Sequence, residues 1–227
     1  MRFQDRTDAG RQLAALLTEY RDESPLVLGL PRGGVPVAYE IARTLGVPLD
    51  VWVVRKVGAP GQPELGLGAV AEGGALFLDR GMMRSLGVSE AEVSRTAEWE
   101  AEEVDRRVAR FRGAHPAPDI QGRTVILVDD GVATGGTVRA AIRALRERRP
   151  GKIVLAVPVG AVESLESLRP EVEDIVCVHP AEFMRSVGEF YDDFNQTPDE
   201  EVQQLLARAR EQGGPRAAMD AGDNWWV

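Results

Sequence analysis

Short apolar runs alternate with amphipathic segments along most of the chain. Each apolar run is short, rich in branched aliphatic residues and bounded by glycine, proline or charged residues, which predicts a buried strand. These runs are Leu26 to Leu30, Leu49 to Val54, Arg123 to Val128, Lys152 to Val157 and Asp174 to Val178. Apolar residues at helical spacing predict helices over Asp8 to Tyr20, Val35 to Leu45, Val138 to Arg148 and Val162 to Leu168. Strands that alternate with helices predict an α/β fold with a parallel sheet.

The middle of the chain has a different pattern. Lys56 to Gly68 is rich in glycine and proline, which predicts a loop. Ala69 to Glu72 and Ala75 to Leu78 flank Gly73-Gly74, which predicts a hairpin.

Polar residues mark where several helices begin. Ser89 and Glu92 have the spacing of a capping box, so we expect a helix from there to about Phe111. Thr7 or Asp8 is expected to cap the first helix. A last helix is expected over Asp199 to Arg210, with Thr197 and Pro198 at its start.

Length and composition are those of one globular domain. The chain has 227 residues, of which 44% are hydrophobic and 28% are charged. We expect a domain over residues 1–211. The glycine-rich segment 212–227, which ends near Trp225 and Trp226, is expected to be a flexible tail.

Charge and cysteine content narrow the function classes. The formal net charge is -9, which disfavours a nucleic-acid partner, because such binding depends on Lys and Arg at phosphates. Cys177 is the single cysteine, so no intrachain disulfide forms, and its apolar neighbours predict an inert thiol. The sequence has neither a signal-peptide pattern nor an apolar run of membrane-spanning length, so we expect a cytoplasmic protein without a membrane partner.

The most informative segment runs from Val125 to Thr137. An apolar strand ends in Asp129 and Asp130, and a loop of small and hydroxylated residues then leads into a helix. In open α/β sheets, ligands bind at the carboxyl ends of the strands. Backbone N–H groups of such a loop can surround a phosphate, and carboxylates accept hydrogen bonds from sugar hydroxyls. The segment therefore indicates a sugar-phosphate site.

Two alternatives explain the segment less well. A purely structural turn with capping aspartates leaves two adjacent carboxylates repelling each other at the end of a buried strand. A Walker-type nucleotide loop requires a lysine before its last Ser or Thr, and Gly136 stands at that place.

The segment resembles the phosphoribosyl diphosphate signature of type I phosphoribosyltransferases, which has four apolar residues, two acidic residues, three variable residues and Thr-Gly-x-Thr. The resemblance implies a Rossmann-like parallel-sheet core with a small hood, here at about residues 179–197. It implies that Asp129 and Asp130 act in catalysis, holding the ribose and, through water, Mg²⁺. The residues implied to bind the ribose 5-phosphate are Val132, Ala133, Thr134, Gly135, Gly136 and Thr137. Ala133 and Gly136 resemble the adenine and orotate branches and depart from the hypoxanthine-guanine branch, which has Asp and Lys there.

Two further segments are similar to the same family. Leu30-Pro31-Arg32-Gly33-Gly34 resembles the pyrophosphate loop, whose sharp turn often contains a non-proline cis peptide, so Arg32, Gly33 and Gly34 are expected to bind the diphosphate. Arg55 and Lys56 resemble the Arg-Lys pair that opens the mobile catalytic loop, so both are expected to act on the leaving group. Glu64 in that loop is as well explained by an exposed acid as by a role near the base.

The hood of this family recognises the base. Phe183 and Tyr191 are candidates to stack on a flat ring, although packing within the hood explains any single aromatic residue better. His179 begins the hood and His115 lies before the Asp129 strand, and a structural role is expected for both.

The resemblance implies a transferase that moves the phosphoribosyl group from phosphoribosyl diphosphate to a small nitrogen acceptor, with Mg²⁺ as cofactor and in a homodimer. The chain from about residue 1 to 210 also resembles a group of bacterial phosphoribosyltransferases whose substrate is not defined. A non-catalytic regulator that binds the same diphosphate is the alternative. A synthase of the diphosphate is a third interpretation, but that family pairs two such domains.

Overall fold

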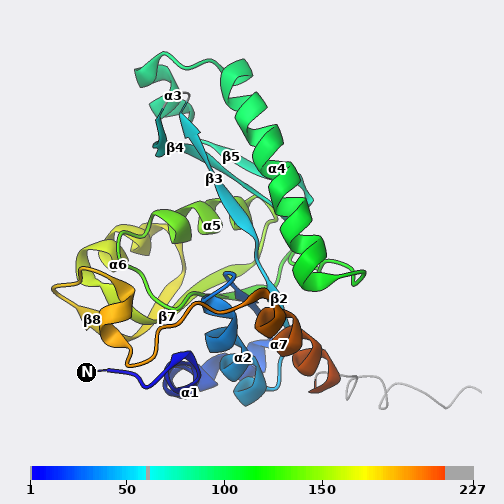
Figure 1. Cartoon of the computed structure of the whole chain (residues 1–227), viewed down its shortest axis with the longest axis vertical. Helices are drawn as coiled ribbons and strands as arrows, with labels where there is room; N and C mark the ends of the chain where they lie inside the picture. The colour runs from blue at the N-terminus through cyan, green and yellow to red at the C-terminus, as the bar shows by residue number, and fades with distance from the viewer. Residues whose placement is uncertain (1, 60–61, 213–227) are drawn as a thin grey trace, which may run out of the picture.

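A five-stranded parallel sheet forms the centre of the lower part of the molecule (Figure 1). The computed structural model describes residues 2–59 and 62–212, without the side chains of residues 62–65. The strand order is β2-β1-β6-β7-β8, and every neighbouring pair is parallel. The bounds are β1 (Leu26–Gly29), β2 (Leu49–Val51), β6 (Thr124–Val128), β7 (Lys152–Ala161) and β8 (Asp174–Ala181). The predicted α/β class with a parallel sheet is confirmed.

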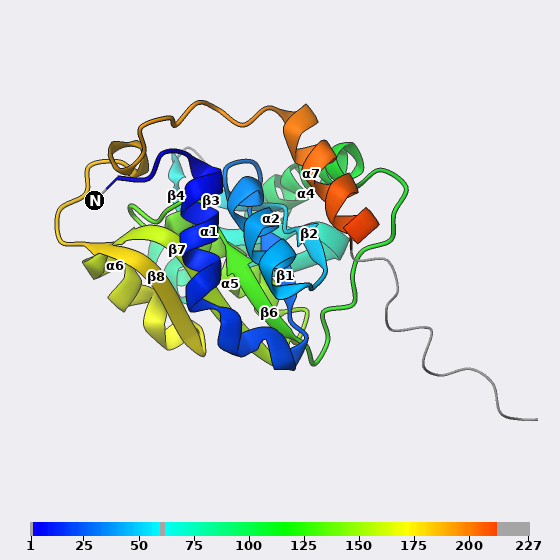
Figure 2. The ribbon, with the colours of Figure 1, turned by 90° about the horizontal axis from the view of Figure 1, so that it is seen from below.

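Helices cover both faces of this sheet (Figures 1 and 2). On one face lie α1 (Arg6–Leu16), α2 (Gly34–Leu45) and, packed on α2, α7 (Asp199–Gln212). On the other face lie α5 (Gly136–Arg146) and α6 (Val162–Leu168). Successive strand residues point to opposite faces, so Ile126 joins the first core and Leu127 the second. This double burial is why the strands are apolar throughout.

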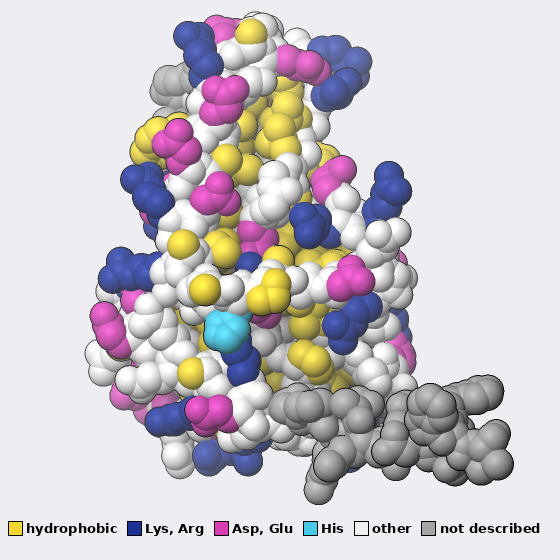
Figure 3. Space-filling model, turned by 90° about the vertical axis from the view of Figure 1, so that its right-hand side faces the viewer, with side chains coloured by type: hydrophobic (Ala, Val, Ile, Leu, Met, Phe, Trp, Pro, Cys, Tyr) yellow, Lys and Arg dark blue, Asp and Glu magenta, His cyan; other side chains and the backbone are white. Residues whose placement is uncertain are grey.

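A three-stranded antiparallel sheet and two helices form an arm above the core (Figure 1). Its elements are β3 (Val54–Ala59), β4 (Gln62–Ala71), β5 (Ala75–Leu78), α3 (Arg80–Leu86) and α4 (Glu90–Arg112). The arm exposes several large apolar side chains, namely Leu76, Met82, Leu86 and Trp99. Apolar surface is also visible in the upper half of Figure 3.

The loop predicted over Lys56 to Gly68 was wrong, because β3 and β4 pair across most of it. Glycine is normally unfavourable in strands, but a Cβ at Gly68 would lie 2.3 Å from the carbonyl oxygen of Phe77 on β5. The glycine therefore permits close strand pairing. The predicted hairpin around Gly73-Gly74 is confirmed, with β4 antiparallel to β5 around the short 3₁₀ segment Glu72–Gly74.

Several predicted boundaries need correction. The first α-helix begins at Arg6, and Asp5 caps it by accepting from the Asp8 amide, so neither Thr7 nor Asp8 is the cap. The chain continues after α1 as the 3₁₀ helix Thr18–Glu23. Three elements are not predicted from the sequence, namely α3 and the 3₁₀ helices Arg169–Glu171 and Val187–Phe190. The capping box of Ser89 and Glu92 is confirmed.

Other sequence predictions have mixed outcomes. Cys177 lies half-buried on β8, where burial raises the pKa of its thiol to about 11. The thiol is therefore protonated near neutral pH, as expected for an unreactive cysteine. No helix in the described part of the chain combines the length and apolar character of a membrane span. Residues 213–227, which make up nearly all of the predicted tail, lie outside the described residues.

A buried ion-pair cluster joins the arm to the core. Arg112, at the end of α4, is 3% exposed. Its Nε donates to Asp50 Oδ2 at 2.9 Å, and its Nη2 donates to Glu72 Oε1 at 2.9 Å. Burial raises the pKa of both carboxyls, and the charge and hydrogen bonds of Arg112 oppose that rise. Arg112 thus opposes the effect of burial on both acids.

Arg112→Met removes the cation and leaves Asp50 and Glu72 buried without their partner. We expect the free energy of unfolding to fall by about 3–5 kcal/mol, the usual range for breaking a buried ion pair. Urea denaturation followed by circular dichroism measures the change. Arg106→Met is the control on the same helix, since Arg106 pairs with Glu103 at the surface, and its denaturation midpoint should match the wild type. Equal midpoints for all three proteins would contradict a stabilising role for the cluster.

Candidate functional site

Two loops emerge side by side where the strand order reverses. From β1 the chain continues to β2 on one side, whereas β6 and then β7 lie on the other side. Gly29 at the end of β1 pairs with Val128 at the end of β6. Ligands of open α/β sheets bind at such a switch point, outside the carboxyl ends of the strands. The predicted Pro31 to Gly34 and Asp129 to Thr137 segments therefore meet in space.

Glycines allow the two loops to touch. A Cβ at Gly33 would lie 2.0 Å from Asp130 Oδ2, and a Cβ at Gly34 would lie 2.5 Å from the Val128 carbonyl oxygen. The peptide bond between Pro31 and Arg32 is cis, as the family resemblance implies. The Gly34 amide closes the turn by donating to the Leu30 carbonyl at 3.0 Å. A side chain at either glycine position would push the acidic pair away.

The acidic pair is partly buried and tightly held. Asp129 Oδ1 accepts a hydrogen bond from the Asp130 amide at 2.9 Å. Burial raises the pKa of Asp129 well above its usual range, and the negative charge of Asp130 raises it further. Burial also raises the pKa of Asp130, whereas the nearby Arg6 guanidinium lowers it. Two neighbouring buried acids with raised pKa values are typical of a functional site.

Arg6 is a site residue that the sequence analysis missed. It lies at the start of α1, and its Nε donates to Asp130 Oδ2 at 2.8 Å. The polar N-terminal sequence offers no local signal for this contact, because 124 residues separate the two side chains along the chain.

The loop after Asp130 leads to a helix start that is open to solvent. Val132 is fixed to β7, since its amide donates to the Val159 carbonyl at 2.9 Å. Gly135 precedes α5 with a φ of 75° and has no side chain to cap the helix. Thr134, Gly136 and Thr137 are exposed. The first amides of a helix have no partner within it, so they can bind an anion here.

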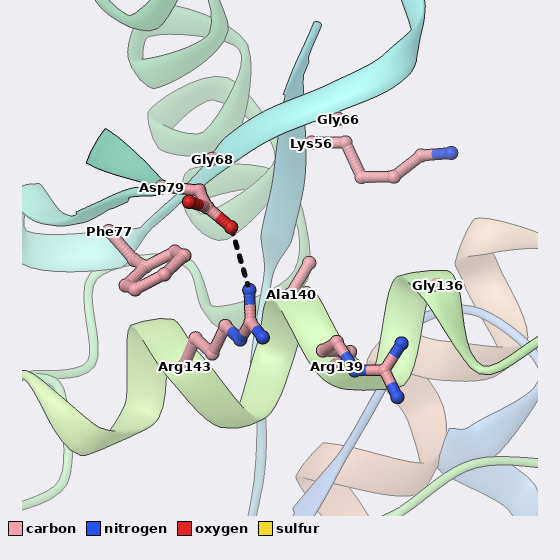
Figure 4. Close-up of a pocket in the computed structure, with 9 residues that line it drawn as sticks. All are labelled: Lys56, Gly66, Gly68, Phe77, Asp79, Gly136, Arg139, Ala140 and Arg143. Atoms are coloured by element: carbon pink, nitrogen blue, oxygen red, sulfur yellow. Dashed lines mark ion pairs between the residues drawn. The ribbon is translucent and has the colours of Figure 1, made fainter. Parts of the chain in front are cut away.

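The predicted Arg55-Lys56 pair is divided between two faces of the arm sheet. Both residues lie on β3, where neighbouring side chains point to opposite sides. Arg55 Nε donates to Glu100 Oε2 on α4 at 2.5 Å. Lys56 instead lines a pocket beside Gly136 (Figure 4). The structure therefore separates the two side chains, with Arg55 against α4 and Lys56 beside the start of α5.

The pocket beside Lys56 has a volume of about 210 Å³ and lies between the arm and α5 (Figure 4). Arg139 and Arg143 on α5 form its basic wall, and each donates through Nε to one oxygen of Glu171 at 2.8 Å. Arg143 also pairs with Asp79 at 3.8 Å. These contacts hold Arg139 and Arg143 in place near Gly136, at the start of α5.

Arg32 extends from the turn toward α7. Its Nη1 donates to Asp199 Oδ1 at 3.3 Å, and Arg110 binds the other oxygen of Asp199 at 2.7 Å. The Arg32 side chain remains about one third exposed. It is therefore at the edge of the turn rather than enclosed in it.

The hood segment closes over the other side of the site. Tyr191 is only 3% exposed, packs between Phe3 and Phe194, and donates its hydroxyl to the Asp130 carbonyl at 2.6 Å. Its ring has no free face, so the stacking role predicted for it is corrected to a structural one. Phe183 is 90% exposed and remains available. The N-terminal segment before α1 completes the hood, because the Phe3 amide donates to the Phe190 carbonyl at 2.8 Å.

The acidic pair suits a magnesium ion that is held through water and substrate rather than by protein ligands alone. No group of three or more His, Cys, Asp or Glu side chains suited to a metal ion occurs among the described residues. Mg²⁺ usually binds through one or two carboxylates, several waters and substrate phosphates. Asp129 and Asp130 fit that mode and do not form a cage of protein ligands.

Fold and site together define an α/β protein with an acidic pair and an open helix start at the switch point of a parallel sheet. The model of the phosphoribosyl transferase domain family matches residues 3–191, and the chain belongs to this family.

The chain is similar to two proteins over almost its whole length. It is 41% identical over 219 residues to a Mycobacterium tuberculosis (H37Rv) protein provisionally named a phosphoribosyl transferase, covering 96% of this chain and 49% of that protein. The chain thus spans about half the length of this relative. TT1426 from Thermus thermophilus, a crystal structure, is 43% identical with a TM-score of 0.85, covering 92% of this chain and 99% of that one.

A shorter match joins the chain to another protein. Over 64 residues it is 48% identical to the bifunctional protein PyrR 1 of Lactiplantibacillus plantarum, covering 28% of this chain and 36% of that protein. This match relates the two proteins over those 64 residues only.

Tyr191→Phe removes the hydroxyl that holds the Asp130 carbonyl and keeps the packed ring. We expect a loss of about 1 kcal/mol of unfolding free energy, because a buried acceptor loses its partner. Thermal and urea denaturation measure it. Tyr39→Phe is the matched control, since the Tyr39 hydroxyl only accepts a bond from Gln212 on α7. If Tyr191→Phe proved as stable as the control, the hydroxyl would not fix the site.

Proposed function

We propose that this chain is a phosphoribosyltransferase. It transfers the 5-phosphoribosyl group of phosphoribosyl diphosphate to a nitrogen atom of a small acceptor such as a nucleobase, and it releases pyrophosphate. The contact of the Gly33-Gly34 turn with Asp129 and Asp130, beside the open start of α5, supports this proposal most directly. In this proposal the turn binds the diphosphate, the acid pair binds the ribose diol and the start of α5 binds the 5′-phosphate.

Each part of the site has a role in the proposed reaction. Asp129 and Asp130 accept hydrogen bonds from the ribose hydroxyls, and the loop from Val132 to Thr137 holds the 5′-phosphate. The acceptor nitrogen forms a bond to C1 of the ribose while the bond from C1 to the diphosphate oxygen breaks. Negative charge grows on the departing diphosphate, where the Gly33 amide, Arg32 and Lys56 stabilise it, while the Gly34 amide holds the turn through its bond to Leu30.

Magnesium is part of this proposal. When bound, Mg²⁺ would neutralise diphosphate oxygens, with Asp129 and Asp130 holding it through water. Arg55 contributes indirectly, because its bond to Glu100 holds the strand that presents Lys56. Phe183 remains our candidate for contact with the acceptor ring. The domain limits 1–211, the homodimer and the cytoplasmic location also remain predictions.

Asp130→Asn tests the acid pair. We expect kcat/KM for pyrophosphate release to fall roughly 10- to 100-fold, because a hydrogen bond to a charged group contributes about 1.5–3 kcal/mol. Purified protein is incubated with phosphoribosyl diphosphate, Mg²⁺ and each of a panel of nucleobases, and pyrophosphate is measured. Asp105→Asn, an exposed carboxylate change on α4, is the control and should keep wild-type kinetics. Wild-type kinetics in Asp130→Asn would refute the assignment of this acid.

Gly33→Ala tests the contact between the loops. Its new Cβ would displace the Asp130 carboxylate, so we expect ribose 5-phosphate to bind at least about tenfold more weakly while the circular dichroism spectrum is unchanged. Isothermal titration calorimetry measures the affinity. Gly81→Ala on α3 is the control, because a Cβ there meets nothing closer than 3.4 Å. Undiminished binding by Gly33→Ala would show that the close approach is not needed.

The same assay separates an enzyme from a regulator. Tight binding of phosphoribosyl diphosphate without pyrophosphate release from any acceptor would favour a non-catalytic sensor. The match to a bifunctional protein over 64 residues is the observation that keeps this second function in view.

A further inference from the structure

Arg6 connects three parts of the molecule that are distant in sequence. From the first turn of α1, its Nε donates to Asp130 Oδ2 at 2.8 Å, and its Nη1 donates to the Asn195 carbonyl at 2.7 Å. Its guanidinium also lies over the Phe194 ring, 4.0 Å from the centroid. The side chain is only 12% exposed, so these contacts are made largely out of water.

We infer that Arg6 is a positioning residue, which fixes the carboxylate of Asp130 for the ribose of the donor and links the hood to that carboxylate. This inference rests on the proposed function. It assigns a role to a residue outside every segment that resembles the family's motifs.

The bond pattern explains how Arg6 orients the acid. A carboxylate has two oxygens, and Arg6 occupies Oδ2 of Asp130, which leaves Oδ1 for a ligand hydroxyl. A Cβ built at Gly33 would lie 2.0 Å from that same Oδ2 and 3.2 Å from Arg6 Nε. The side chain of Asp130 is thus confined between the guanidinium and the glycine turn. The Asp130 side chain therefore has little rotamer freedom before a ligand binds. Ligand binding then loses less side-chain entropy.

Arg6 is itself held rigidly enough for this task. Asp5 caps α1 immediately before it, so the Arg6 backbone belongs to a fixed helix start. Its guanidinium is planar, and two of its nitrogens donate in different directions, to the acid and to the hood. Tyr191 of the hood holds the Asp130 carbonyl as well. Displacement of the hood would therefore disturb both the backbone and the side chain of this acid.

Arg2 provides the comparison that separates positioning from simple tethering. It also joins the N-terminus to the hood, donating to the Glu189 carbonyl at 3.1 Å and to Asp192 at 3.4 Å. Its side chain is 62% exposed, and neither of these bonds involves the acid pair. A role that only ties the N-terminus to the hood would be shared by both arginines, whereas positioning of Asp130 belongs to Arg6.

The experiment compares Arg6→Gln, Arg6→Lys and Arg2→Gln with the wild type, all below their melting temperatures. Calorimetry gives the dissociation constant of ribose 5-phosphate, and pyrophosphate release gives kcat and KM for phosphoribosyl diphosphate. For Arg6→Gln we expect the dissociation constant and KM to rise roughly 10- to 100-fold, the effect of losing a charged hydrogen bond. Arg6→Lys should recover part of the loss, because lysine keeps the charge but not the two-way geometry. Arg2→Gln should stay within about twofold of wild type.

Each result decides the inference. Wild-type affinity in folded Arg6→Gln, or equal losses in Arg6→Gln and Arg2→Gln, would overturn it while the proposed function stands. If Arg6→Gln does not fold, folded Arg6→Lys decides: a raised KM supports positioning, and a wild-type KM overturns it. If the wild type binds neither ribose 5-phosphate nor phosphoribosyl diphosphate, the proposed function fails and the role of Arg6 fails with it.

Discussion

The contact between Gly33 and the carboxylate of Asp130 is the constraint on which the rest of the site depends. It exists because β1 and β6 are neighbours in the sheet and both loops leave from their carboxyl ends. The space available at that point is smaller than a methyl group, so only glycine fits without moving the acid. The Gly33-Gly34 turn and the acid pair are thereby held at a separation set by backbone packing.

Buried ion pairs stabilise the structure at two places, the site and the arm. At the site, Arg6 stabilises an acid whose ionisation burial opposes, and it joins that acid to the hood. In the arm, Arg112 does the same for Asp50 and Glu72 and joins α4 to the core. In both cases one arginine satisfies groups from distant segments. Loss of the cation would leave the buried acids without a compensating charge, which destabilises the folded state.

Sequence patterns were most reliable where local chemistry is decisive. The strand ending at Val128, the capping box at Ser89 and the helix end at Leu45 all follow from side-chain types over a few residues. The pairing of β3 with β4, where a loop was expected, does not follow from local side-chain types. The glycines of that segment suit close strand approach as well as they suit a loop. Local composition does not distinguish a loop from paired strands here. Contacts with β5 and α5 decide for the strands.

The sequence by itself determined the fold class, through the alternation of apolar strands and amphipathic helices along the chain. It also determined where the acid pair and the small-residue loop after it lie, since both belong to one continuous segment. Tertiary structure alone decided that Arg6 reaches Asp130, that Arg55 and Lys56 face opposite ways, and that Tyr191 is buried. The physical reason is the same in each case. A side chain's partners are set by which elements pack beside it, and that depends on contacts between residues more than forty positions apart.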